Sequence, residues 1–301
     1  MSRYGADMLR IERILCPVDF SESSARAYDS AQSLARHYQA KLLLQHVVDF
    51  ILPAYAYYVD AVYINELFRT IRDGAGKQLL DFARSNTRTG IHPECLVQEG
   101  DAADSILSFA AAQKVDLIVM GTHGLKGVDR AALGSVTEKV LRKARCPVLV
   151  SRKTGQRVAA PEGVQDSVQL RRVVFCTDFS DPARRALEYA LSVAGEYDAE
   201  ITLLHVLEDV QRLDNIKEAI ATAAKQIDKL VPAECGGSPK IKTMVRIGRD
   251  YEQIIQFASD IQADLLIMAV RGRSALDLAV FGSTTYRAIQ LGPCSVLAVH
   301  G

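Results

Sequence analysis

The sequence contains one pattern twice, and this internal repeat constrains the fold more than any other feature. Residues 13–21 (RILCPVDFS) align with 172–180 (RVVFCTDFS), an offset of 159 residues. Residues 133–150 align with 281–298, an offset of 148 residues. Because the offset falls by 11, the first copy carries about 11 additional residues, which we assign to the tyrosine-rich stretch 50–68. A repeat of about 150 residues indicates a duplicated domain and not a solenoid.

The polar stretch 153–169, which contains Pro and Gly, lies between the two copies and is typical of a linker. We therefore predict a first domain over 1–152 and a second domain over 170–301. The chain of 301 residues has room for two domains of ordinary size.

Each copy alternates short apolar runs with segments of helical spacing. In the first copy we expect strands at 13–18, 41–48, 92–98, 115–120 and 146–151, and helices at 22–38, about 61–85, 102–113 and 135–144. Continuous apolar strands separated by amphipathic helices indicate a parallel sheet that is covered on both faces. Right-handed crossovers then restrict the fold to an α/β doubly wound sheet in each half.

Composition and charge exclude several classes of protein. The chain has 36 basic and 36 acidic residues, so we expect no nucleic-acid partner. The N-terminus lacks the apolar core of a signal peptide, and no run approaches the roughly 18 apolar residues of a membrane span. We therefore expect no membrane partner. Six cysteines occur without a C-x-x-C pair, which favours reduced thiols in a cytoplasmic protein.

A glycine-rich segment follows the apolar run 115–119. Gly121, Gly124 and Gly134 occur with the spacing G-x2-G-x9-G, and Ser135 then opens a predicted helix. Glycine lets the backbone approach an anion and adopt positive φ, so that successive N–H groups can form an anion-binding nest. The helix N-terminus favours the same ligand. This segment therefore predicts a phosphate-binding loop.

Other residues support or compete with that interpretation. Asp19 ends the first apolar run and would face the glycine loop if the two strands are neighbours, where its carboxylate suits ribose hydroxyls. Lys126 and Arg130 are cations close in sequence. As an alternative, Ser135 and Glu138 form an S-x-x-E capping box that needs no ligand. The spacing matches neither a Walker A loop nor a Rossmann fingerprint.

Together these segments resemble the universal stress protein family in its tandem two-domain form. The resemblance rests on CPVDFS at 16–21, LLQHVVD at 43–49, MGTHGLKG at 120–127 and the segment 133–150, and it extends over nearly the whole chain twice. It implies two adenine nucleotide alpha hydrolase-like domains of five strands each, in the order 3-2-1-4-5. It also implies that the domains pair through their last strands as an intramolecular pseudo-dimer, and that two chains pair further as a homodimer.

The resemblance also assigns a nucleotide site in the first domain, whose motif is intact. It places the ribose at Asp19 and Gly121, the adenine at the backbone of Val47, and the phosphates at Gly124, Gly134 and Ser135. Further residues expected to line this pocket are Pro17, Val18, Met120, His123, Val136 and Thr137. The expected ligand is ATP, ADP or AMP, with Mg²⁺ as a candidate companion ion and no protein metal site.

The second copy departs from this pattern. Gly121 is replaced by Ala269, whose methyl group occupies the ribose approach and disfavours positive φ, whereas Arg271 and Arg273 add positive charge. The positions equivalent to the first site are Asp178, Val206, Gly272, Gly282, Ser283 and Thr284. We expect weaker nucleotide binding in this degenerate motif.

Three functions follow from these features. The leading hypothesis is a non-catalytic, ATP-binding stress-response regulator that is read out through domain pairing or a protein partner. The second is a slow ATPase or autokinase that uses Asp19 and His123. The third is a nucleotide-independent module that binds a ligand or a protein through the second domain.

Two smaller features have simpler interpretations. His46 and His205 occupy equivalent strand positions, which favours structural packing. The aromatic stretch 55–63 contains Tyr55, Tyr57, Tyr58 and Tyr63. It is either a lid over the first pocket, or a surface for packing or dimer formation.

Overall fold

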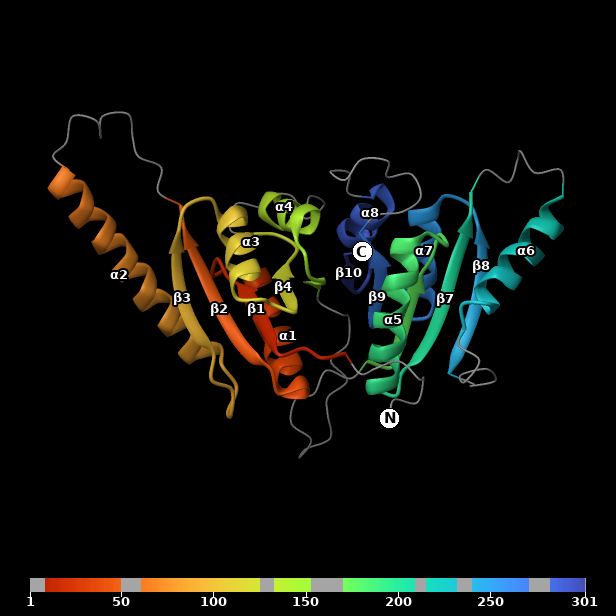
Figure 1. Cartoon of the computed structure of the whole chain (residues 1–301), viewed down its shortest axis with the longest axis horizontal. Helices are drawn as coiled ribbons and strands as arrows, with labels where there is room; N and C mark the ends of the chain where they lie inside the picture. Colours follow the sequence, from red (N-terminus) through yellow and green to blue (C-terminus); the bar gives the residue numbers. More distant parts are fainter. Residues whose placement is uncertain are drawn as a thin grey trace.

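The computed structural model describes residues 9–49, 61–124, 133–152, 170–208, 215–231, 240–270 and 282–300. These residues form a single ten-stranded sheet with helices on both faces (Figure 1). The strand order is β3-β2-β1-β4-β5-β10-β9-β6-β7-β8. Each half therefore has the predicted order 3-2-1-4-5, and the predicted fold class is confirmed.

The first half contributes β1 (Arg13–Pro17), α1 (Glu22–Tyr38), β2 (Lys41–Val48), α2 (Ala61–Asn86), β3 (Glu94–Glu99), α3 (Ala102–Ala112), β4 (Leu117–Gly121), α4 (Ser135–Lys143) and β5 (Val148–Ser151). The second half contributes β6 (Arg172–Cys176), α5 (Asp181–Glu196), β7 (Glu200–Leu207), α6 (Ile216–Asp228), β8 (Ile241–Ile247), α7 (Asp250–Asp260), β9 (Leu265–Ala269), α8 (Ser283–Leu291) and β10 (Ser295–Val299). Within each half all the strand pairs are parallel.

The two faces of the sheet bury two separate hydrophobic clusters. One face packs against α1, α2, α5 and α6, and the other packs against α3, α4, α7 and α8. Tyr28 and Phe175 are the largest fully buried side chains and belong to the first cluster. Burial on both faces is the physical reason that the strands read as continuous apolar runs.

Local polar contacts set the ends of the elements. Ser21 caps α1 by accepting the N–H of Ser24 at 3.1 Å, as the sequence suggested. The fourth strand begins at Leu117 and not at 115, because the side chain of Asp116 is hydrogen-bonded to the backbone at the start of β1. Its Oδ2 accepts the N–H groups of Glu12 (2.8 Å) and Arg13 (2.9 Å) at the start of β1.

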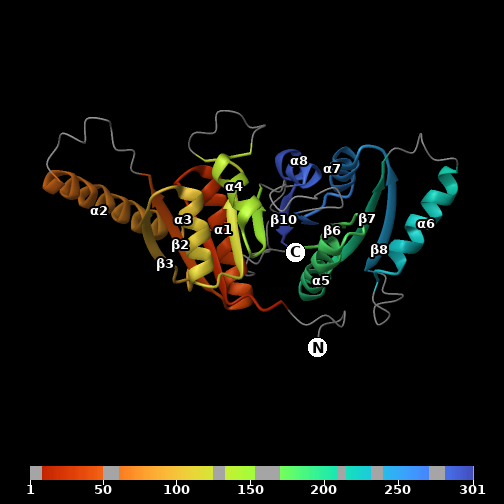
Figure 2. The same cartoon turned by 45° about the horizontal axis from the view of Figure 1, so that its top comes forward.

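The last strands of the two halves pair inside the chain. β5 and β10 run antiparallel, and Val148, Leu149 and Val150 face Ala298, Leu297 and Val296. This contact joins the two five-stranded sheets, as Figure 2 also shows near the centre of the molecule. The expected intramolecular pairing through the last strand is therefore present. The predicted domain limits at 152 and 170 stay predictions, since 153–169 lie outside the described residues.

Reciprocal side-chain contacts connect the halves as well. Arg152, after β5, donates to the carbonyls of Gly292 (2.7 Å) and Ile289 (3.3 Å) at the end of α8. His300, after β10, donates its Nε2–H to the carbonyl of Leu141 in α4 at 2.8 Å. Positions 152 and 300 are equivalent in the repeat, so each half satisfies carbonyls of the other half's last helix.

Candidate functional site

The site predicted from the sequence lies at the carboxyl ends of β1 and β4. These strands are neighbours, with Ile14 opposite Leu117 and Leu15 opposite Ile118. After β1 the chain passes to α1 on one face of the sheet, whereas after β4 it passes to α4 on the other face. Ligands of doubly wound sheets bind where the connections diverge in this way.

Asp19 and the glycine loop meet across this divergence. A Cβ atom built on Gly124 would lie 2.5 Å from Oδ2 of Asp19, so the carboxylate reaches the backbone of the loop. The other oxygen, Oδ1, accepts the backbone N–H (3.1 Å) and the hydroxyl (2.6 Å) of Ser21. The predicted juxtaposition of Asp19 with the glycine loop is thus found in the structure.

Phe20, which the sequence analysis did not select, follows Asp19 in an unusual backbone conformation. Its φ of 65° is in the left-handed region, which is strained for a bulky residue. Its ring lies 4.4 Å from the ring of His46, whose Nδ1–H donates to the carbonyl of Val18 at 2.8 Å. A strained residue that neighbouring contacts fix in place is typical of functional sites.

The second half repeats this arrangement. Phe179 has a φ of 64° and lies 4.4 Å from His205, which donates to the carbonyl of Thr177 at 2.7 Å. These contacts agree with a structural role for His46 and His205. The Asp-Phe pair present in both copies was the signal that could have directed attention to Phe20.

Gly134 and Gly124 bring two backbone segments into contact. Gly134 donates its N–H to the carbonyl of Thr122 at 2.9 Å. A Cβ on Gly134 would lie 3.4 Å from that oxygen, 3.6 Å from Cα of His123 and 3.8 Å from N of Gly124. The missing side chain therefore lets these two backbone segments approach each other closely at the start of α4.

The expectation that the motif glycines adopt positive φ is wrong. Among the described glycines, positive φ occurs at Gly90, Gly100 and Gly248 and not in the motif. Gly121 in particular serves close packing, since its Cβ would lie 2.9 Å from the backbone C and O atoms of Ser23 in α1. Its expected approach to a ribose stays a prediction.

The capping-box alternative is also wrong. The N-cap of α4 is Gly134, Ser135 is the first helical residue and is exposed, and no side chain caps the helix. Glu138 instead accepts from Arg142 at 2.7 Å. Within the described part of the chain, the first-turn N–H groups of α4 thus lack a side-chain acceptor, which makes this end suitable for an anion.

Several predicted pocket residues are buried instead of lining an open surface. Val18 and Met120 are each 5% exposed and belong to the hydrophobic clusters, and Pro17 is buried at the end of β1. Thr137 is also 5% exposed, and its hydroxyl donates to the carbonyl of Gly121 at 3.0 Å. These side chains pack in the core or hydrogen-bond to the backbone, so they support the site and do not form its open surface. Val136 is partly buried against the same core.

The hydrogen bonds of neighbouring residues show which way the peptide groups of Val47 face, and its adenine contact stays a prediction. Val18 donates its N–H to the carbonyl of Gln45, and Gly100 donates to the carbonyl of Val48 from the opposite side of β2. Since peptide groups alternate along a strand, those of Val47 face the β1 side. β1 ends at Pro17, so these groups point beyond the strand end toward the site.

Of His123 and the two loop cations, only His123 lies among the described residues. His123 pairs its Nδ1 with the hydroxyl of Thr122 at 2.8 Å, and its N–H reaches Oγ of Ser23 at 3.4 Å. Lys126 and Arg130 lie outside the described residues, as do Tyr55, Tyr57 and Tyr58.

The second half keeps the framework and differs at its helix start. Oδ1 of Asp178 accepts from Ser180 as its counterpart does, and Gly282 donates to the carbonyl of Val270 at 3.0 Å. Thr284, however, donates its hydroxyl to Asp250 of α7, whereas the equivalent Val136 has no hydroxyl. Ser283 is exposed, and Val206 is partly buried. Gly272, Arg271 and Arg273 lie outside the described residues.

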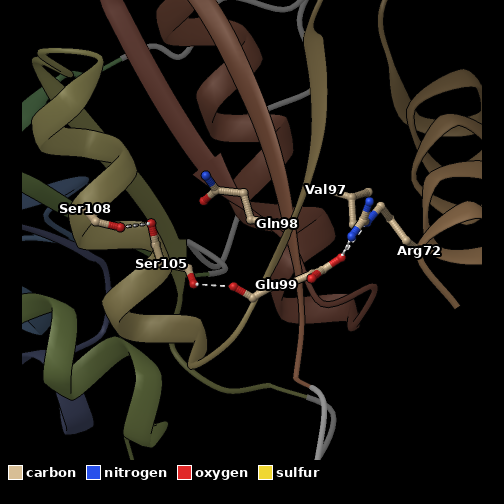
Figure 3. Close-up of a pocket in the computed structure, with 6 residues that line it drawn as sticks. All are labelled: Arg72, Val97, Gln98, Glu99, Ser105 and Ser108. Atoms are coloured by element: carbon tan, nitrogen blue, oxygen red, sulfur yellow. Dashed lines mark hydrogen bonds and ion pairs between the residues drawn. The ribbon is translucent and has the colours of Figure 1, made fainter. Parts of the chain in front are cut away.

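A cavity of about 420 Å³ lies elsewhere, beside the edge strand β3 (Figure 3). Its polar lining is engaged within the fold: Arg72 pairs with Glu99, Ser105 donates to the carbonyl of Glu99 at 3.2 Å, and Gln98 accepts from Gln45. The cavity does not include the glycine loop.

Comparison with known proteins agrees with this architecture. Residues 10–152 and 169–300 each match the model of the universal stress protein family. The chain belongs to this family. A universal stress protein of Methanocaldococcus jannaschii is 38% identical over 144 residues, which are 47% of this chain and 82% of that protein. One of Bacillus subtilis is 33% identical over 145 residues, 46% of this chain and 98% of that protein. Each relative thus corresponds to about one half of the tandem chain.

A solved universal stress protein has the same fold over the whole length. The structure from Archaeoglobus fulgidus matches with a TM-score of 0.67 at 22% identity, covering 97% of this chain and 99% of that chain. A functionally unknown protein of Pseudomonas aeruginosa matches with a TM-score of 0.64 at 18% identity, covering 96% and 92%. Both similarities concern the fold.

No three His, Cys, Asp or Glu side chains in the described part of the chain gather as a metal site would require. None of its helices has the length and apolar character needed to cross a membrane.

Proposed function

We propose that the first half binds an adenine nucleotide and that the bound state regulates how the chain pairs with itself or with a partner. The observation that carries the proposal is the N-terminus of α4, which no side chain caps and which lies against the backbone of residues 122–124. Backbone N–H groups and the helix dipole stabilise phosphate oxygens without any cationic side chain.

The remaining residues fit the rest of the nucleotide. The Asp19 carboxylate, which Ser21 holds by two hydrogen bonds, would accept hydrogen bonds from ribose hydroxyls. The peptide groups of Val47 would offer one donor and one acceptor to the edge of a base. Mg²⁺ would accompany the phosphates as part of the ligand.

A physical route leads from this site to the other half. The N-terminal turn of α4 would contact the phosphates, and the carbonyl of Leu141 in the same helix is bonded by His300 of the second half. A small shift of α4 on binding would therefore act on the contact between the halves. Regulation would then be a difference in affinity between two arrangements of one chain.

Calorimetric titration with ATP tests this site. Gly134→Ala should fold normally, because its nearest contacts of 3.4–3.8 Å are ordinary van der Waals distances, but its methyl group would stand between the start of α4 and the backbone of residues 122–124, where the phosphates are proposed to bind. We expect at least about tenfold weaker binding, which corresponds to about 1.4 kcal/mol. Gly282→Ala, the equivalent change in the second half, should leave this affinity unchanged. Equal affinity in the wild type and Gly134→Ala would exclude the assignment.

A further inference from the structure

Helix α2 differs from its repeat counterpart in length and in position. It has 26 residues, whereas α6 has 13. Its C-terminal part packs on the sheet through Ala75, Leu79 and Ala83, which are buried. Its N-terminal part extends beyond β3, away from the body of the molecule (Figures 1 and 2).

The extended part carries exposed apolar side chains along one face. Tyr63 is 62% exposed, Leu67 is 42% exposed and Ile71 is 39% exposed. Their spacing of four residues aligns them on the helix surface. Gly74 continues this face by one turn, and we call these four residues the α2 stripe.

Gly74 is informative because it has no neighbour. A Cβ built there would meet no atom of the described chain within 4 Å. A glycine inside a helix costs about 0.5–1 kcal/mol relative to alanine. No contact within the described chain explains this residue, whereas close approach of a second helix would.

The charges beside the stripe indicate which helix that is. Glu66, Arg69, Asp73 and Lys77 lie along one flank, and all four are exposed without an ion pair among the described residues. Their signs alternate, so the flank turned end for end is complementary to itself. Antiparallel pairing would join Glu66 to Lys77 and Arg69 to Asp73, and both pairs place the twofold axis near Ile71. A partner of uniform charge would not match this flank.

We propose that the α2 stripe is a homodimer contact at which two copies of the chain pack antiparallel about a twofold axis near Ile71. In this register Ile71 packs against Ile71 of the second copy, Leu67 lies beside Gly74 of that copy, where the missing side chain permits close approach, and four ion pairs set the register. An isologous contact of this kind closes at two copies. The inference is independent of nucleotide binding, because α2 lies outside the site between β1 and β4.

Sedimentation equilibrium tests the contact. At about 100 µM, we expect a species with twice the 33.0 kDa mass of the chain. The double substitution Leu67→Asp with Ile71→Asp should give a monomer. Ile216→Asp is the control, since Ile216 is 42% exposed on the repeat counterpart α6 and lies outside the proposed contact. A monomeric wild type, or a dimer that survives the double substitution, overturns the proposal.

Charge reversal tests the antiparallel register. Glu66→Lys alone should weaken the dimer about tenfold at low salt, because two attractive pairs become repulsive. Adding Lys77→Glu should restore the dimer. Failure of this second change to restore association would overturn the proposed register, and circular dichroism would confirm that each variant is folded.

Discussion

At the scale of single residues, the glycines of the site act through contact distances. Gly134 brings the start of α4 against the backbone of residues 122–124, whereas Gly121 allows α1 to touch β4. In the second half, Ala269 replaces Gly121, and Pro182, which has no hydroxyl, replaces Ser23. Gly121 and Ser23 touch each other, so both replacements change the same packing contact. The replacement of Gly121 by Ala269 is therefore first a change in how helix and strand pack, and only second a change near a ligand.

This difference between the glycines gives a prediction for stability. Gly121→Ala should lower the free energy of unfolding by about 1–3 kcal/mol, because the added methyl group would overlap the Ser23 backbone at 2.9 Å. Urea denaturation measures the change. Gly134→Ala is the control and should unfold like the wild type. Wild-type stability in Gly121→Ala would contradict the packing role.

The residues of the site were only partly predictable from the sequence. The pairing of Asp19 with the loop at Gly124 followed from the strand order, which the repeat and the apolar runs predicted. The positive φ of Phe20 and the role of Gly121 could not be predicted, because they depend on how closely α1 approaches β4. The cap of α4 was shifted by one residue for a similar reason, since a pattern of residue types does not fix the dihedral angles of Gly134.

At the scale of elements, most limits agree with the sequence patterns to within about two residues. α1 and β2 begin and end as predicted, because the Ser21 cap and the continuous apolar run are local signals. α2 begins at the predicted residue, but its projection beyond the sheet was not predicted. The amphipathic pattern identifies the face that packs and does not show how far a helix extends past its support.

α2 also contains a glycine whose replacement should stabilise the protein. Gly76→Ala should raise the free energy of unfolding by about 0.5–1 kcal/mol, because alanine restricts the unfolded chain and meets open space in the helix. Thermal denaturation measures the gain. Gly90→Ala also meets open space but should destabilise the protein, since Gly90 has a φ of 81°. If both changes had the same sign, the backbone argument would fail.

At the scale of the whole molecule, the tandem arrangement lets equivalent positions diverge at their contact. His37 and Glu196 are equivalent in the repeat and lie 3.7 Å apart, from Nε2 to Oε2. The His37 ring also stacks on Tyr197 with centroids 4.4 Å apart. In a dimer of identical chains each position would meet itself, whereas one chain can place an imidazole against a carboxylate.

The reciprocal caps predict how strongly the halves are coupled. Arg152→Ala should lower the free energy of unfolding by about 1–3 kcal/mol, because the carbonyls at the end of α8 lose a charged donor. Chemical denaturation gives the value. Arg142→Ala removes only an exposed pair with Glu138 and should change stability by less than about 0.5 kcal/mol. Similar effects of the two substitutions would contradict a special role for Arg152.

The buried thiol and phenol groups predict that the protein loses stability at alkaline pH. Burial raises the pKa of the Cys146 thiol to about 11 and that of Cys294 to about 12, and it raises the pKa of Tyr28 to about 12. Below their unfolded-state pKa values these groups are neutral in both states. As the pH rises above about 9, the unfolded state ionises first, so each buried thiol loses about 1 kcal/mol of stability per pH unit. A free energy of unfolding that stays constant between pH 8 and 10.5 would contradict this prediction.

The central claim is that backbone amides at the start of α4 hold the phosphates of a nucleotide. A crystal structure of the chain grown with saturating ATP tests it most directly. We expect phosphate oxygens within about 3 Å of the first-turn nitrogens of α4, beside Gly134 and Ser135, with the ribose at Asp19. Phosphate density at another place, or a start of α4 without bound nucleotide in that crystal, would contradict it.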